Sequence, residues 1–394
     1  GVVKIMITFS SGIQPSSLWQ RAGRFHFDTI LICALLFLLA WGTIMIYSTS
    51  AVYAGLRYDN SYYYLQRHLI HVILGFGVIT LATLTPYQRW RDWLPLMMLI
   101  MLAMLVMVLI PGIGHEVKGG RRWLRIAGFG FQPAELMKVV LIVYLASYLE
   151  RKRPLIQSFN RGIGPCLLVS GFYMLLILLQ PDFGTVVLFA TTVLMMLFVG
   201  GCRIWHLIAC VSVVASLGVA LVMTQAYRMR RILAFLDPWE DPLDSGFQII
   251  QSFIAIGTGG WFGRGLGESR QKLFFLPDAH TDFIFAILSE ELGFFWVCVL
   301  VALFGVFIWR GFWIAWHAHD EFGKYLALGC TSVLSLQVII NLFVVSGMLP
   351  TKGMPLPFIS AGGSALIMAM TCTGILLNIS HHIHSPTNTS PPRN

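Results

Sequence analysis

Long apolar runs separated by mostly short polar connections follow one another along the chain. Ten of these runs approach the roughly 20 residues that a helix needs to cross a bilayer. The predicted spans are 29–47, 68–86, 94–111, 134–149, 163–180, 184–199, 204–223, 284–309, 325–347 and 362–380. An even number of spans places both termini on one side of the membrane. The pattern therefore predicts an all-α integral membrane protein with about ten transmembrane helices.

The connections divide the chain into an N-terminal segment (1–28), a membrane domain (29–380) and a tail rich in Ser, Pro and Asn (381–394), which we expect to be disordered. Nothing in the N-terminal segment is typical of a cleavable signal peptide, so we expect the first span to direct insertion. Three connections are long: 48–67, 112–133 and 224–283. The last of these predicts a large extracytoplasmic loop between helices 7 and 8.

Composition agrees with this assignment, because 57% of the residues are hydrophobic and only 11% are charged, whereas soluble domains are about 25% charged. The net charge of +9 is interpreted first as a signal of membrane topology, and we expect no nucleic acid partner. The seven cysteines lie in or beside apolar runs without a CxxC pair. We interpret them as small apolar residues, neither disulfides nor metal ligands.

The basic residues favour cytoplasmic termini once the long loop is discounted. Thirteen lie on each side of the predicted topology, and removing the six in 224–283 leaves seven on the outside. Two basic clusters on that outer side, within 118–125 and 228–231, suggest an anionic ligand. Solvated loop charges or contacts with lipid headgroups remain an alternative.

Inserting a charged side chain at mid-bilayer costs roughly 2.5–3.5 kcal/mol. We therefore expect each charged residue inside a predicted span to have an interaction partner or a functional role. Glu135 and Lys138 stand three residues apart on one helix face, so they can pair directly. The pair either fixes helix packing or forms the polar wall of a cavity. Glu290 and Glu291 lie early in the eighth span, and we expect at least one of them to cap the helix or contact a loop.

The predicted extracytoplasmic loop is the segment richest in candidate functional residues. Its glycine-rich segment 257–267 allows either close backbone approach to a ligand or a series of tight turns, and it lacks the spacing of a nucleotide site. Asp282 directly precedes the eighth span and is the best candidate for a general base. The alternative is that Asp282 is only the N-cap of that helix.

Six short motifs resemble the SEDS family (shape, elongation, division and sporulation) across about residues 28–380. They are KGGRRW (118–123), FQPAELMK (131–138), QPDFGT (180–185), LPDAHTDFIF (276–285), EELG (290–293) and PLPF (355–358). PWEDP (238–242) and PTKG (350–353) resemble the cell-division branch, FtsW, more than the elongation branch, RodA.

The resemblance implies a peptidoglycan glycosyltransferase that polymerises lipid II into glycan strands for septal cell-wall synthesis. Asp282 falls on the family's catalytic aspartate and would act as general base, while basic residues stabilise the pyrophosphate leaving group. The residues expected to bind substrate are Lys118, Arg122, Trp123, Arg228, Arg231, His280, Lys352 and Ser360.

The resemblance also implies partners and a location. The expected partners are lipid II, a class B penicillin-binding transpeptidase, other divisome membrane proteins and the bilayer. The expected location is the bacterial cytoplasmic membrane, at the septum, with both termini cytoplasmic. No cofactor is certain, although a divalent cation, Mg²⁺ or Mn²⁺, is compatible with the chemistry. A lipid II flippase and a non-catalytic divisome scaffold are the alternative functions.

The chain departs from the family pattern at Gly130, where relatives often carry a basic residue, and at Ala361 and Ala365, which replace a tyrosine and a serine. At Gly130, either Arg125 or Arg122 takes over the role of the basic residue or that role is absent. Ala361 and Ala365 remove an aromatic hydroxyl and a serine near the last span.

Overall fold

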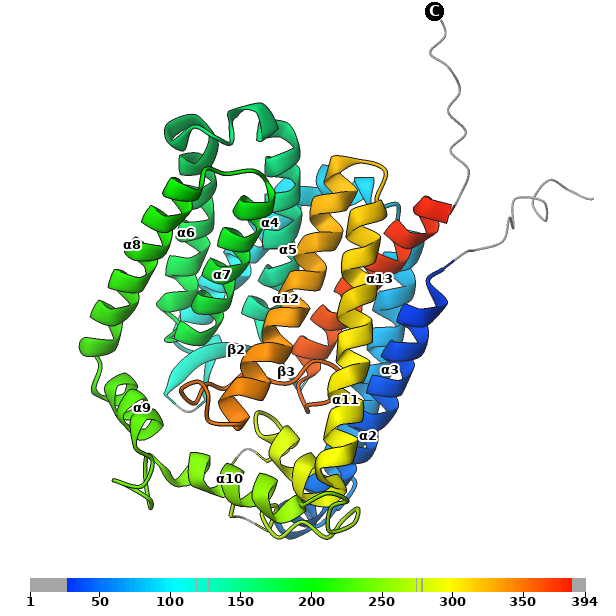
Figure 1. Ribbon diagram of the computed structural model, residues 1–394, viewed down its shortest axis with the longest axis vertical. Helices are drawn as coiled ribbons and strands as arrows, with labels where there is room; N and C mark the ends of the chain where they lie inside the picture. Colours follow the sequence, from blue (N-terminus) through cyan, green and yellow to red (C-terminus); the bar gives the residue numbers. More distant parts are fainter. Residues whose placement is uncertain (1–26, 118, 127, 274, 278, 385–394) are drawn as a thin grey trace, which may run out of the picture.

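Ten long helices stand side by side in a bundle, with two shorter helices and a small sheet at one end (Figure 1). The computed structural model describes residues 27–117, 119–126, 128–273, 275–277 and 279–384. We call the end of the bundle where the first long helix begins and the last one ends the terminal end. The opposite end, which carries the shorter helices and the sheet, is the loop end.

Each of the ten long helices overlaps one predicted span. They are α2 (Thr29–Tyr58), α3 (Tyr63–Leu84), α4 (Gln88–Leu109), α5 (Pro133–Lys152), α6 (Gly164–Leu178), α7 (Phe183–Val199), α8 (Ile204–Met223), α11 (Ile284–His317), α12 (Glu321–Val345) and α13 (Gly363–His384). Two short turns, η1 (Arg153–Leu155) and η2 (Phe159–Ile163), join α5 to α6. The prediction of an all-helical membrane fold is confirmed.

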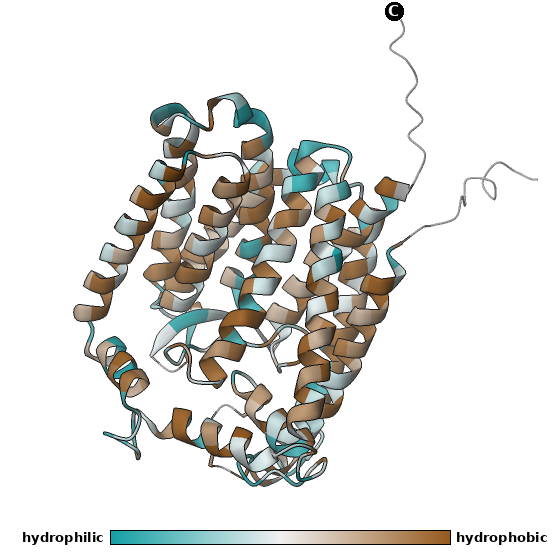
Figure 2. Ribbon diagram, in the orientation of Figure 1, coloured by the Kyte–Doolittle hydropathy of each residue, from teal (hydrophilic) through white to brown (hydrophobic). Residues whose placement is uncertain are grey.

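The hydrophobicity of the helices fits a multi-pass membrane protein. Within the described ranges, eight helices are long and apolar enough to cross a bilayer, counting η2 with α6. The other two predicted spans are α7, which has 17 residues, and α5, which carries Glu135 and Lys138 near its start. Hydrophobic residues dominate the helices, whereas hydrophilic residues gather mainly at the two ends of the bundle (Figure 2).

The centre of the bundle is formed by α5, α12 and α13 (Figure 1). Every residue of α5 from Pro133 to Leu149 is buried except Leu136. In contrast, α8 exposes most of its side chains. Because the outward-facing side chains are apolar, lipid is the solvent that matches them.

The terminal end is held by a buried charge pair. Asp28 is the N-cap of α2 and accepts a hydrogen bond from the N–H of Leu31 at 3.0 Å. Its other carboxylate oxygen accepts from Nε of Arg310 on α11 at 2.9 Å. The Asp28 carboxylate therefore caps the N-terminus of α2 and also connects α2 to α11.

Helices α2 and α11 extend furthest beyond the ends that their apolar runs predicted. Helix α2 continues to Tyr58 and α11 continues to His317, because polar residues can extend a helix beyond the bilayer while its backbone hydrogen bonds stay internal. Inside α11 the helical geometry breaks at Gly293, which has φ 80° and ψ 179°.

The two other long connections also contain regular structure that the hydrophobic pattern did not predict. Residues 112–132 include a three-stranded antiparallel sheet, β1 (Gly114–Val117), β2 (Gly120–Ile126) and β3 (Phe129–Phe131), in which Leu124 pairs with both Gly114 and Phe131. Within 224–283 lie α9 (Ala226–Leu236) and α10 (Phe247–Gly259), which lie across the loop end (Figure 1).

Candidate active site

Asp282 lies immediately before α11 at the loop end, against the loop that joins α12 to α13. A Cβ placed on Gly353 would lie 2.8 Å from Oδ2 of Asp282, so the carboxylate contacts a position that only glycine leaves open. The N-cap position of α11 belongs to Phe283, which makes no side-chain cap bond. The interpretation of Asp282 as the N-cap residue is therefore wrong.

Asn341 of α12 fixes the backbone on both sides of this contact. Its buried amide donates to the carbonyl of Asp282 at 2.9 Å and to the carbonyl of Met354 at 2.7 Å. One side chain thus holds the segment that carries Asp282 and the loop that carries Gly353 in a fixed relation. No sequence pattern predicts this role, because a lone Asn in an apolar helix has no distinctive spacing.

Lys352 adjoins Gly353, and its side chain passes over the start of α7. A Cβ on Gly184 would lie 2.3 Å from Cε of Lys352, so the lysine side chain occupies the space that the missing side chain of Gly184 leaves open. Burial lowers the pKa of Lys352 to about 8; the nearby Asp182 carboxylate opposes this shift and Lys138 adds to it. The site therefore contains a cation whose charge changes near neutral pH.

Asp182 organises the polar groups beneath Lys352, and our sequence-based list of site residues omits it. As N-cap of α7 it accepts from the N–H of Thr185 at 3.1 Å, and its second oxygen accepts from the Thr185 hydroxyl at 2.9 Å. The same oxygen accepts from Nε2 of Gln132 at 3.2 Å, and the backbone N–H of Gln132 donates to Ser364 of α13 at 2.9 Å. The QPDFGT motif contained the signal, an acidic residue at the start of a span.

Glu135 and Lys138 form a buried ion pair of 2.7 Å within α5, as their spacing predicted. Oε2 of Glu135 is buried and has no hydrogen-bond partner in the described part of the chain. Because Lys138 acts electrostatically on Lys352, the pair faces the same polar region as Lys352 and Asp182. This geometry is compatible with the wall of a polar cavity as well as with a packing role.

Three of the predicted arginines converge on this region. Nε of Arg122 donates to the carbonyl of Gln180 at 3.1 Å, and the guanidinium of Arg228 lies over the ring of Phe183 at 5.3 Å. Nη1 of Arg231 donates to the carbonyl of Thr351 at 3.3 Å. The arginines therefore reach the turn before α7 and the Lys352 loop from two sides, the sheet and α9.

The other predicted substrate-binding residues take different positions. The His280 ring packs against Tyr64 with 4.7 Å between ring centroids, and the Ser360 hydroxyl accepts from the N–H of Leu356 at 2.8 Å. Trp123 lies in the sheet beside Gly130, where a Cβ would be 3.3 Å from its ring. Lys118 lies outside the described residues.

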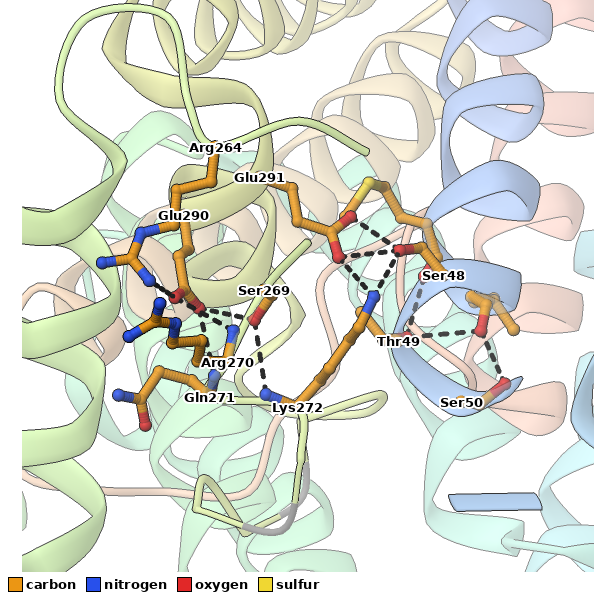
Figure 3. A network of polar contacts seen from close by, with 12 residues as sticks. Ser48, Thr49, Ser50, Arg264, Ser269, Arg270, Gln271, Lys272, Glu290 and Glu291 are labelled. Atoms are coloured by element: carbon orange, nitrogen blue, oxygen red, sulfur yellow. Dashed lines mark hydrogen bonds and ion pairs between the residues drawn. The ribbon is translucent and has the colours of Figure 1, made fainter. Parts of the chain in front are cut away.

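Glu290 and Glu291 fasten the segment that precedes the Asp282 motif to the bundle (Figure 3). The carboxylate of Glu290 accepts hydrogen bonds from the hydroxyl of Ser269 and the N–H of Arg270, and Arg264 lies 3.5 Å away. The expectation that at least one of the two glutamates contacts a loop is confirmed.

Glu291 makes the second attachment. It pairs with Nζ of Lys272 at 2.8 Å and accepts from the Ser48 hydroxyl of α2 at 2.6 Å (Figure 3). Both members of the ion pair are almost fully buried, with side-chain exposures of 5% and 0%. This attachment joins the segment that contains Lys272, α11 and the extended part of α2.

The glycine-rich segment packs against the broken backbone of α11. The N–H groups of Arg264 and Gly265 donate to the carbonyls of Glu290 and Glu291 at 3.0 and 2.9 Å. A Cβ on Gly263, which has φ +78°, would lie 2.1 Å from the Glu291 carbonyl oxygen. The backbone of this segment thus approaches α11 closely, and its approach to a ligand stays a prediction.

Comparison with known proteins matches residues 28–385 to the FtsW/RodA/SpoVE family of cell cycle proteins. The chain is 43% identical over 355 residues to the probable peptidoglycan glycosyltransferase FtsW of Geobacter sp. (strain M18), covering 90% of this chain and 96% of the relative. It is 45% identical over 357 residues to stage V sporulation protein E of Bacillus subtilis (strain 168), covering 90% and 97%.

Solved structures share the fold. A chain from a peptidoglycan synthase complex that coordinates polymerization and crosslinking matches with a TM-score of 0.75 and 27% identity, covering 91% of this chain and 98% of that one. The rod shape determining protein RodA of Thermus thermophilus matches with a TM-score of 0.68 and 25% identity, covering 92% and 99%. By sequence and by fold, the chain belongs to the FtsW/RodA/SpoVE family.

Proposed function

We propose that this chain is a peptidoglycan glycosyltransferase that polymerises lipid II. The observation that carries the proposal is the contact of the Asp282 carboxylate with Gly353, next to Lys352 and within a region that three arginines approach. A carboxylate beside several cations suits a reaction in which a hydroxyl attacks and a pyrophosphate leaves. The names of relatives that are more than 40% identical support the same activity.

In the proposed reaction, Asp282 accepts the proton of the 4-hydroxyl on the acceptor glucosaminyl sugar. The hydroxyl oxygen forms a bond to C1 of the donor muramyl sugar while the bond from C1 to the pyrophosphate oxygen breaks, with inversion at C1. The departing pyrophosphate takes the bonding electrons, and Lys352, Arg122, Arg228 and Arg231 stabilise its charge. A second carboxylate nucleophile is not needed for a single displacement.

A divalent cation, Mg²⁺ or Mn²⁺, is compatible with this site. Within the described ranges no three His, Cys, Asp or Glu side chains gather to hold a metal ion. Asp282 would therefore share such a cation with pyrophosphate oxygens of the substrate, which are ligands that Mg²⁺ commonly uses. The cation would neutralise charge on the leaving group.

We also propose that the terminal end faces the cytoplasm, that the protein works at the septum with other divisome membrane proteins, and that its partner is a class B penicillin-binding transpeptidase. The distribution of basic residues supports the orientation. The similar chain from a synthase complex supports a partner that crosslinks. In this orientation Asp282 lies on the extracytoplasmic side.

The function is tested by incubating the purified chain, alone and with the partner transpeptidase, with fluorescent lipid II in proteoliposomes. We expect glycan strands that increase in length with time and disappear after muramidase digestion. Movement of lipid II between leaflets without strands would favour the flippase. Neither strands nor movement, in a sample whose partner complex is intact, would favour the scaffold.

Lys352 predicts a specific pH dependence of the reaction. Its pKa of about 8 means that the ammonium is charged below this pH and loses its charge as the pH rises through it. We therefore expect kcat/KM, which reports the free enzyme, to fall above about pH 8 in the wild type.

Two substitutions separate this effect from other titrations. Lys352→Arg keeps a positive charge at every pH of interest, so its profile should lose the decline. Lys352→Met should be slow across the whole range. A decline that persists unchanged in Lys352→Arg would show that another group titrates.

A further inference from the structure

A polar cavity that is wide open to its surroundings lies at the terminal end of the bundle, opposite the candidate active site. It has a volume of about 420 Å³ and lies between the turns that join α5 to α6 and the start of α8. Its lining residues are Pro154, Leu155, Gln157, Ser158, Phe159, Arg203 and His206. The volume falls within the roughly 300–1,000 Å³ of small-molecule sites.

The polar groups of this cavity are suited to an anion. The Arg203 guanidinium is exposed and makes no ion pair or hydrogen bond with any residue within the described ranges. Nδ1 of His206 is buried without a hydrogen-bond partner among those residues, and the Phe159 ring lies 5.6 Å from the imidazole, centroid to centroid. Gln157 and Ser158 add neutral polar groups, and no carboxylate lines the cavity.

Neighbouring charges do not neutralise Arg203. The nearby Arg153 pairs with Glu321 at 2.8 Å, and Arg91 pairs with Glu150 at 3.0 Å. The carboxylates of Glu150 and Glu321 at the adjoining helix ends are thus paired with other arginines. Arg203 remains available for a ligand that carries a negative charge of its own.

On the side formed by α8, the cavity adjoins exposed apolar side chains. Ile204, Trp205 and Ile208 follow Arg203 on α8 and are exposed, with Trp205 76% exposed. Tryptophan is typical of the boundary between lipid and water, and α8 is hydrophobic enough to cross the bilayer. A ligand held at Arg203 would therefore have an apolar surface running from it toward the bilayer centre.

These observations point to an amphiphile with a phosphate group and acyl chains. We propose that the cavity binds the headgroup of an anionic phospholipid from the leaflet at the terminal end, with the acyl chains along α8. Arg203 donates charge-assisted hydrogen bonds to the phosphate, and His206 contributes a ring nitrogen. The cavity is separate from Asp282, and the proposal does not depend on the glycosyltransferase activity.

The test measures lipid binding to the purified full-length chain by native mass spectrometry. Phosphatidylglycerol and phosphatidylcholine with identical acyl chains are titrated against wild type, Arg203→Gln and Arg161→Gln. Arg161 lies in η2 and is exposed, but it does not line the cavity. Arg161→Gln is therefore the control, because it removes one positive charge from the terminal end of the bundle without changing the cavity. Thermal unfolding of each variant checks that it is folded.

We expect wild type to prefer phosphatidylglycerol and Arg203→Gln to bind it about tenfold more weakly, as the loss of one charge-assisted hydrogen bond implies. Arg161→Gln should bind like wild type. Equal retention of both lipids, or equal weakening by the two substitutions, would overturn the proposal. Displacement of the lipid by millimolar inorganic phosphate would assign the cavity to free phosphate instead of a phospholipid.

Discussion

Replacing Asp282 by asparagine is expected to lower the rate of lipid II polymerisation by about 10²–10⁴-fold, the usual contribution of a general base. Asparagine has the same shape, so the contact with Gly353 and the backbone bond from Asn341 are kept, and only the proton acceptor is lost. The loss should appear in kcat while the affinity for lipid II changes little. The measurement is strand formation in proteoliposomes at saturating lipid II.

Two comparisons make this result specific. Asp244→Asn removes a carboxylate from the same connection between α8 and α11, where its side chain is 77% exposed, and should leave the rate unchanged. Gly353→Ala places a methyl group against Oδ2 of Asp282 and should slow the reaction by displacing a carboxylate that is still present. Strands formed at the wild-type rate by Asp282→Asn would remove this residue as the base.

Replacing Lys272 by methionine is expected to destabilise the protein by about 3–5 kcal/mol, because it leaves the carboxylate of Glu291 buried without its cation. The pair has a distance of 2.8 Å and is almost fully enclosed, so water cannot compensate. Since this pair joins the segment before the Asp282 motif to α2 and α11 (Figure 3), activity should fall with stability. The unfolding midpoint of the detergent-solubilised protein gives the first measurement.

An exposed ion pair from the same region provides the control. Arg230 and Asp244 lie 3.9 Å apart with side-chain exposures of 69% and 77%, so Arg230→Gln should cost less than about 1 kcal/mol. The double variant Lys272→Met with Glu291→Gln should recover much of the lost stability, because no unpaired charge stays buried. Equal effects of Lys272→Met and Arg230→Gln would contradict the buried attachment.

Some elements of the site were predictable from short-range patterns. The spacing of Glu135 and Lys138 predicted a pair that the structure contains at 2.7 Å. Asp282 stood out as an acidic residue before a span, although the structure assigns the N-cap position to Phe283. Asp182 carried the same kind of signal, and its role became visible only when Gln132 and Lys352 were placed beside it.

The sequence by itself determined the number and approximate limits of the membrane helices, because crossing lipid requires about 20 apolar residues whose backbone groups bond within the helix. It also pointed to Asp282 and to the basic clusters. The sheet in 112–132, the break at Gly293 and the Asn341 contacts were decided only by the tertiary structure. The break and the Asn341 contacts depend on groups far apart in the chain, such as Gly263 against Glu291 or Asn341 against Asp282. The sheet depends on backbone pairing between short neighbouring strands, such as Gly114 with Leu124. Local hydrophobicity carries no information about either kind of contact.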